Sequence, residues 1–217
     1  MTPDLSVYLV TDSALAASAG HDVVSLVRAA VAGGVSAVQV REKKASARVF
    51  LETVLAVADV LPASVALIVN DRVDVFLAAR AAGARVAGVH VGQSDLPVSA
   101  VRALVGPDAV IGVSAATDEQ LRRAATDGAL VDYVGIGALR ATRTKADAPP
   151  SLGHAEFARL VARSALPAVA IGGVTSADLP LLRRAGAAGA AIVSAICAAD
   201  DPRRAALVLR EAWGAAS

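Results

Sequence analysis

Residues 37–43 read AVQVREK, a short apolar run that ends in a cluster of polar and charged residues. The same pattern recurs along the whole chain. The runs are VYLVTD (7–12), AVQVRE (37–42), ALIVND (66–71), GVHVGQ (88–93), VIGVSA (110–115), YVGIGA (133–138), AVAIGG (168–173) and AIVSA (191–195). Between them lie Ala-, Leu- and Arg-rich stretches long enough for one helix each. Such runs are typical of strands buried on both faces of a parallel sheet, so the 217 residues predict a (β/α)8 barrel, an α/β fold in which residues 1–217 form one domain.

Composition narrows the classes of partner. The chain carries 21 basic and 20 acidic residues, and it has no strongly basic stretch with interleaved aromatics, so nucleic acid is not an expected partner. Its single cysteine, Cys197, excludes an internal disulfide and fits a reducing compartment. The N-terminus lacks the basic and long apolar regions of a signal peptide. The longest uncharged stretch, 185–199, is too short to span a bilayer, which needs about 20 apolar residues. We therefore expect a cytoplasmic protein with no membrane contact.

Helix starts fall between the runs, where the barrel needs them. Asp22, Ser99, Thr117 and Ser176 each precede a helical pattern and are residue types that cap helix N-termini. In a (β/α)8 barrel the loops that follow the strands gather on one face. The polar residues that end the runs are therefore expected to form one ring.

The second run places two cations and an amide on one face. Side chains alternate along a strand, so Gln39, Arg41 and Lys43 are expected to point into the barrel mouth, and Val40 and Glu42 away from it. Together the three inward residues favour binding of an oxyanion such as phosphate or pyrophosphate. The alternative is that the two cations are ordinary solvated rim charges.

Two carboxylates end neighbouring strands. Asp71 follows ALIVN, and Asp95 follows the fourth run in GQSD. Such a pair suits Mg²⁺, which takes one or two carboxylates together with water and phosphate oxygens. The alternative is that either aspartate caps the helix that follows it.

Three further segments indicate anion contacts. Thr142, Arg143, Thr144 and Lys145 form a polar loop after the sixth run, and an ordinary solvated loop is the alternative there. Ser114 ends the fifth run and points to the same chemistry weakly. Gly172-Gly173 and Val193-Ser194 follow the seventh and eighth runs, where this fold commonly binds phosphate through backbone N–H groups.

Other candidate residues are assigned no catalytic role. His90 lies within a run and is interpreted as a core histidine with a satisfied hydrogen bond. His21 and His154 have no carboxylate partner visible in the sequence, and Cys197 is interpreted as buried. No general base or nucleophile stands out. Two anion sites with two carboxylates between them fit an enzyme that joins two phosphorylated substrates as pyrophosphate leaves, by positioning and charge neutralisation.

The segments QVREK, VND, HVGQxD, GVSA, DYVGIG, TRTK, IGGV and IVSAI, in this order and over nearly the whole chain, resemble the thiamine phosphate synthase family. The resemblance implies a transferase that condenses hydroxymethylpyrimidine pyrophosphate with thiazole phosphate or its carboxylate. The products would be thiamine monophosphate and pyrophosphate, plus carbon dioxide from the carboxylate. It also implies that pyrophosphate departs first and leaves a pyrimidinylmethyl cation for the thiazole nitrogen to capture.

The resemblance also assigns residues. The pyrimidine pyrophosphate would be held by Gln39, Val40, Arg41, Glu42, Lys43, Asn70, Ser114 and Lys145. Asp71 and Asp95 would ligate Mg²⁺. Thr142, Arg143, Thr144, Gly173, Val193 and Ser194 would hold the thiazole phosphate. The charged groups Arg41, Lys43 and Lys145 would act in catalysis, and a homodimer is possible.

The chain departs from the family pattern at three places. Ala116 stands where the family usually has His, the GALRATRTK loop lacks two prolines, and the segment between Asp71 and His90 is longer than usual. A related thiazole tautomerase is one alternative, although that enzyme is expected to use a His near the end of the fifth strand. A non-catalytic phosphate-ligand sensor is the other, and the retained aspartates and Lys145 argue against it.

Overall fold

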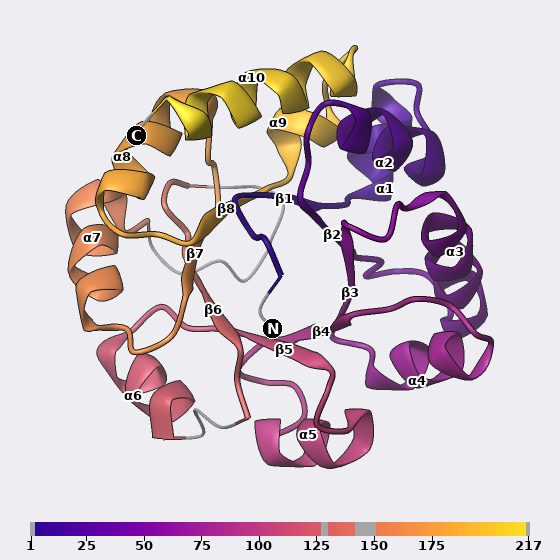
Figure 1. Ribbon diagram of the computed structural model, residues 1–217, viewed down its shortest axis with the longest axis horizontal. Coiled ribbons are helices and arrows are strands. Elements are labelled where there is room, and N and C mark those ends of the chain that lie inside the picture. Colours follow the sequence, from indigo (N-terminus) through magenta and orange to yellow (C-terminus); the bar gives the residue numbers. More distant parts are fainter. Residues whose placement is uncertain (1–2, 127–129, 142–150, 216–217) are drawn as a thin grey trace.

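The computed structural model describes residues 3–126, 130–141 and 151–215. Within them, parallel strands pair in chain order and close into a barrel, because β1 pairs with β8. The strands are β1 (Val7–Val10), β2 (Ala37–Val40), β3 (Ala66–Asn70), β4 (Gly88–Val91), β5 (Val110–Ser114), β6 (Tyr133–Ile136), β7 (Ala168–Ile171) and β8 (Gly189–Ile192). Figure 1 looks along the barrel, with the helices forming an outer ring. The predicted (β/α)8 barrel is confirmed.

Helices follow the strands around the ring. They are α1 (Ser13–Ser18), α2 (Val23–Ala32), α3 (Ala47–Val60), α4 (Val73–Ala81), α5 (Val98–Val105), α6 (Asp118–Thr126), α7 (Gly153–Arg163), the 3-10 turn η1 (Ser176–Asp178), α8 (Leu179–Arg184), α9 (Ser194–Cys197) and α10 (Pro202–Gly214). Among the described residues, no helix combines the length and apolar character that crossing a bilayer requires.

The predicted helix starts can be compared with the observed caps. Asp22 caps α2 by accepting hydrogen bonds from the N–H groups of Val24 and Ser25. Thr117 accepts one from Gln120 N at 3.2 Å, directly before α6. The other two predictions were wrong by one or two residues. Helix α5 begins at Val98 after Pro97, so Ser99 lies inside it, and the residue before η1 is Thr175 instead of Ser176.

Side-chain alternation divides the apolar residues into two cores. Outward residues such as Val38 and Val40 pack beneath the helices. Inward residues form a separate cluster inside the barrel, which includes Tyr8, Ile68 and Tyr133. The interior is therefore filled with side chains, as expected for this architecture, and is not a pore.

The N-terminal segment closes one end of the barrel. In Figure 1 it crosses the centre of the ring, and Leu5 is 2% exposed and belongs to the inner cluster. A Cβ atom at Gly189 would lie 1.7 Å from the Leu5 carbonyl oxygen, so the segment packs directly on β8. The opposite end, where the strands have their carboxyl termini, remains available for a site.

Glycine in β5 makes room for Tyr133, one of the two tyrosines inside the barrel. Gly112 pairs with Tyr133 across β5 and β6, and a Cβ atom at Gly112 would lie 2.2 Å from Tyr133 Cζ. We expect Gly112→Ala to lower the free energy of unfolding by about 1–3 kcal/mol, because overpacking forces a buried ring to move. Urea unfolding followed by circular dichroism measures this difference.

The matched control is Gly214→Ala, at the end of α10, where a Cβ atom would meet no heavy atom within 4 Å. This variant should be as stable as the parent or slightly more stable, because alanine favours helix. Equal stability of the two variants would contradict the packing argument.

Candidate active site

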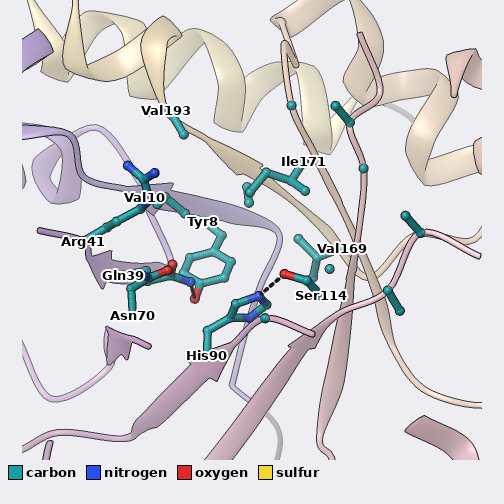
Figure 2. A pocket seen from close by; sticks show the side chains of 18 of the residues that line it. Tyr8, Val10, Gln39, Arg41, Asn70, His90, Ser114, Val169, Ile171 and Val193 are labelled. Carbon is teal, nitrogen blue, oxygen red and sulfur yellow. Dashed lines mark hydrogen bonds between the residues drawn. The ribbon is translucent and has the colours of Figure 1, made fainter. Parts of the chain in front are cut away.

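A cavity of about 560 Å³ opens at the carboxyl ends of the strands. Every strand of the barrel contributes a residue to its wall, from Tyr8 of β1 to Ala191 of β8. Figure 2 shows Arg41, Asn70, His90 and Ser114 around this space. The predicted gathering of polar strand ends into one ring is therefore observed.

The end of β2 supplies the basic side of the cavity. Gln39, Arg41 and Lys43 all line it, as alternation predicted. The Arg41 side chain is 15% exposed, with Nη1 3.7 Å from Asp12 Oδ2, and its backbone N–H donates to Thr11 Oγ1 at 3.0 Å. The residues that follow β1 thus hold the Arg41 backbone and place a carboxylate beside its guanidinium.

The two intervening residues of this segment point elsewhere. Val40 packs in the outer core, and the Glu42 carboxylate accepts a hydrogen bond from the Ser13 hydroxyl at 2.9 Å. Their side chains do not line the cavity, so any contact that they make with a ligand there would use the backbone.

Asp71 and Asp95 lie next to each other at the ends of β3 and β4. Burial raises the pKa of Asp71, and the charge of Asp95 and a hydrogen bond with it raise this pKa further, against the opposing influence of Lys43 and Asn70. Asp71 also has a φ of 59°, an uncommon conformation for a residue other than glycine. Asp95 Oδ2 accepts a hydrogen bond from Gly92 N at 2.7 Å.

The helix-capping alternative does not account for these aspartates. The residue before α4 is Arg72 and the residue before α5 is Pro97, and neither helix has a side-chain cap. Two carboxylates in contact, the half-buried Asp71 and the exposed Asp95, repel each other until a proton or cation lies between them. Among the described residues, no group of three or more Asp, Glu, His or Cys side chains could hold a metal. A carboxylate pair open to solvent fits Mg²⁺, which keeps several waters and phosphate oxygens as ligands.

The loops after β7 and β8 form the opposite side of the cavity. Gly172 and Gly173 have φ values of 93° and 66°, and Val193 and Ser194 line the same space. Helix α9 begins at Ser194 and its N-terminus has no side-chain cap. The first N–H groups of a helix lack intrahelical partners, so they are available to an anion.

A buried aspartate connects the loops on this side, and no local sequence pattern pointed to it. Asp178 is 1% exposed and forms an ion pair with the Arg140 guanidinium. His154 Nε2 lies 2.8 Å from its Oδ1, and both the N–H and the hydroxyl of Thr175 donate to its Oδ2 at 2.8 Å. His154 therefore has the carboxylate partner that the sequence analysis did not find, which corrects that interpretation. Arg140 also donates to the Gly173 carbonyl at 3.2 Å.

A chain of polar side chains crosses the cavity floor. It runs from Gln39 through Tyr8 and Tyr133 to His90 and Ser114. His90 is hydrogen-bonded, as the sequence interpretation expected, but it also lines the cavity, which that interpretation missed. Its position between Val89 and Val91, which pack in the outer core, is the pattern that could have placed it inside the barrel.

Some predicted site residues remain without a structural test. Thr142, Arg143, Thr144 and Lys145 lie outside the described residues. Asn70, Ser114 and Gly173 do line the cavity.

The contacts of Asp178 generate a prediction about stability and pH. Burial alone would raise the pKa of this carboxyl, but hydrogen bonds from Arg140, Thr175 and His154 outweigh it and hold the pKa well below its ordinary 3.8. A depressed pKa means that the stabilisation is complete above the ordinary value and is lost as the pH falls below it. We expect Asp178→Asn to lower the free energy of unfolding at pH 7 by about 2 kcal/mol.

Urea titrations of the parent and the variant between pH 7 and pH 2 measure this difference. It should shrink below about pH 4, where the unfolded carboxyl takes up a proton. Asp74→Asn, which removes an exposed carboxylate paired with Arg72, is the control and should have a small effect. A difference between parent and Asp178→Asn that stays constant down to pH 2 would contradict the assignment.

Comparison with known proteins identifies the family. The sequence profile described as Thiamine monophosphate synthase matches residues 7–196. The "Thiamine-phosphate synthase" of Azorhizobium caulinodans is 47% identical over 208 residues, covering 95% of this chain and 94% of the relative. That of Vibrio campbellii is 44% identical over 202 residues, covering 91% and 93%. The solved structure "Thiamine phosphate pyrophosphorylase from Pyrococcus furiosus" superposes with a TM-score of 0.85 at 30% identity, covering 98% of this chain and 97% of that one. The chain belongs to the thiamine monophosphate synthase family.

Proposed function

We propose that this chain, a transferase by its family, acts as a thiamine-phosphate synthase in which Mg²⁺ assists the departure of pyrophosphate. The substrates are hydroxymethylpyrimidine pyrophosphate and thiazole phosphate or its carboxylate. One observation carries the proposal. One cavity is lined by the basic residues that follow β2, by the carboxylate pair at the ends of β3 and β4, and by the glycine-containing loops after β7 and β8. Two phosphorylated ligands can therefore bind in it side by side.

The pyrimidine pyrophosphate is assigned to the β2 side of the cavity. Gln39, Asn70 and Ser114 would contact it, Arg41 and Lys43 would neutralise its charge together with Lys145, and Val40 and Glu42 would contribute backbone groups. Asp71 and Asp95 would hold Mg²⁺. When bound, the ion would supply positive charge to the pyrophosphate oxygens.

The thiazole phosphate is assigned to the opposite side. Gly173, Val193 and Ser194 would bind it through the backbone, because glycine allows the main chain to approach a phosphate closely. Thr142, Arg143 and Thr144 are assigned here by the family resemblance.

The chemistry then requires little of the protein beyond charge and position. The bond between the pyrimidine methylene carbon and the pyrophosphate oxygen breaks, and the electron pair leaves with pyrophosphate. The thiazole nitrogen donates its electron pair to the carbon and forms the new C–N bond. No proton has to be removed in that substitution, which agrees with the cations, amides and hydroxyls on the pyrimidine side of the site. With the carboxylated thiazole, carbon dioxide is also lost: the bond from the ring carbon to the carboxylate breaks, its electron pair stays on the ring carbon, and that carbon takes up a proton from solvent. Arg41 and Lys43 would stabilise the developing charge on the leaving group.

The remaining assignments are proposals of the same kind. One catalytic domain over residues 1–217 is supported by the pairing of the first strand with the last. The single cysteine, Cys197, supports a reducing cytoplasm. A homodimer is expected from the family resemblance, and sedimentation equilibrium would decide it.

The activity and its metal dependence can be tested together. With both substrates and Mg²⁺ present, the protein should form thiamine monophosphate and pyrophosphate in equal amounts, and excess chelator should abolish both products. Asp71→Asn and Asp95→Asn should each raise the Mg²⁺ concentration for half-maximal rate by about tenfold or more, since even indirect metal partners can contribute that much affinity. Mn²⁺ binding followed by electron paramagnetic resonance measures the same loss without turnover.

Asp74→Asn is the matched control, because Asp74 lies three positions from Asp71 but outside the cavity. It should leave the metal requirement unchanged. Full activity in chelator would rule out the metal assignment, and product formation from the thiazole substrate alone would favour the tautomerase alternative. Binding of both substrates with no product would favour the sensor.

A second prediction concerns the leaving group. Arg41→Gln removes a charge that is needed mainly as pyrophosphate departs, so it should lower kcat and kcat/KM together by about a hundredfold. Steady-state kinetics with each substrate varied in turn measures the effect. Arg48→Gln, an exposed change on the neighbouring helix α3, is the control and should be neutral. A raised KM with an unchanged kcat would make Arg41 a simple binding residue.

A further inference from the structure

The polar chain on the cavity floor consists of hydrogen bonds between side chains from separate strands. Gln39 Nε2 donates to the Tyr8 hydroxyl at 2.7 Å, and the Tyr8 and Tyr133 hydroxyl oxygens lie 2.9 Å apart. His90 Nδ1 lies 3.0 Å from the Tyr133 oxygen, and His90 Nε2 lies 3.1 Å from Ser114 Oγ. Figure 2 shows the Tyr8 ring between Gln39 and His90, with the last bond drawn as a dashed line.

The barrel is shaped to hold these rings. A Cβ atom at Gly112 would lie 2.5 Å from His90 Nδ1, and one at Gly135 would lie 3.2 Å from His90 Cε1. The Tyr8 and Tyr133 rings meet edge to face at 6.1 Å between centroids. Larger residues at either glycine would displace the histidine, so the strands leave space for it in this orientation.

The Gln39 amide at one end sets which group donates and which accepts in each hydrogen bond of this polar chain. Tyr8 accepts from Gln39, and among the described residues the Tyr133 oxygen is the acceptor within reach of its own buried proton, so we assign Tyr8 as the donor in that bond. Tyr133 then donates to His90 Nδ1, which must be unprotonated to accept. The imidazole proton therefore lies on Nε2 and is donated to Ser114 Oγ. Ser114 has accepted one bond, and its own proton is left for a group in the cavity.

The two phenols are suited to this role because they keep their protons. Burial raises the pKa of Tyr8 above its ordinary value, against the lowering effect of its hydrogen bonds with Tyr133 and Gln39. Burial and the neighbouring Tyr8 raise the pKa of Tyr133 in the same direction. Each hydroxyl thus stays a donor as well as an acceptor through the neutral pH range.

We propose that Tyr8, Tyr133 and His90 are positioning residues whose hydrogen bonds fix Ser114 as a donor, so that its hydroxyl selects a substrate with an acceptor atom at that point. The acceptor is an unprotonated heterocyclic nitrogen or a phosphoryl oxygen of the pyrimidine substrate. The choice of substrate rests on the proposed function, whereas the direction of the chain does not.

The direction can be measured without turnover. The protein contains three histidines, His21, His90 and His154. His21 Nε2 faces the Ala199 carbonyl and His154 Nε2 faces the Asp178 carboxylate, so both of these rings also carry a proton on Nε2. Labelled with ¹⁵N at the histidine side chains, the intact protein should in addition show the His90 signal of a neutral imidazole with a proton on Nε2 and none on Nδ1, in long-range proton–nitrogen correlation spectra. Loss of that signal in His90→Gln assigns it. A proton on Nδ1 of His90 would reverse the donors and acceptors in these hydrogen bonds and overturn the proposal.

A double-mutant cycle tests whether the chain acts through Ser114. Tyr133→Phe should weaken binding of the pyrimidine substrate by about tenfold, the contribution of one hydrogen bond. In a Ser114→Ala background the same change should have almost no further effect, because the donor that it orients is gone. Equal effects in both backgrounds would show that Tyr133 acts on packing alone. The Tyr133→Phe spectrum should also show His90 with a mixture of tautomers, which a purely structural role would not produce.

Two controls keep the outcomes distinct. Ser6→Ala removes a buried hydroxyl that precedes β1, near Ser36 and Arg210 at the far end of the barrel, and should leave substrate binding unchanged. Calorimetry with pyrophosphate alone and with hydroxymethylpyrimidine alone identifies which part of the substrate loses affinity in Ser114→Ala. If neither ligand loses affinity in that variant, the donor assignment is overturned. A protein that makes no thiamine monophosphate but shows the Nε2–H tautomer would refute the proposed function and leave the direction of the chain intact.

Discussion

Closure of the barrel through β1 and β8 is the constraint on which the site depends. The pairing of Leu9 with Ile192 fixes which side chains of the first and last strands face inward. Continuous parallel pairing then imposes the same alternation on every strand between them. Because the amino-terminal end is filled by Leu5, inward polar residues can be hydrated only at the carboxyl end. The cavity is the place where this requirement and the strand ends coincide.

The site contains three charged clusters, and in each of them the charge is influenced by a group from another segment of the chain. Arg41 has a carboxylate neighbour in Asp12, whereas Asp71 faces the like charge of Asp95 and is influenced by Lys43. On the other side of the cavity, the charge of Asp178 is balanced by Arg140, and its carboxylate accepts a hydrogen bond from Thr175. Arg41 and the Asp71–Asp95 pair are therefore suited to bind charged ligands. The ion pair of Asp178 is suited to hold the loops in place.

The sequence was informative where chemistry follows directly from alternation along one strand. Gln39, Arg41 and Lys43 could be assigned to one face, and most strand starts agreed, although the last strand begins at Gly189 and not near Ala191. It was silent where contacts join distant positions. Tyr8 and Tyr133 are 125 residues apart, and Arg140 and Asp178 are 38 apart. Such pairs depend on barrel register and loop path, which no local pattern encodes.

The contacts of Asp178 also bear on how this barrel could be redesigned. One buried carboxylate holds Arg140, which precedes residues 142–150, and His154, which follows them. Arg140 and His154, on either side of those residues, are therefore held by a group in another loop. A grafted segment of different length or composition would begin and end at the same points, because loop closure changes only slowly with length. Changes made between these two points would leave the contacts of Asp178 with Arg140 and His154 in place.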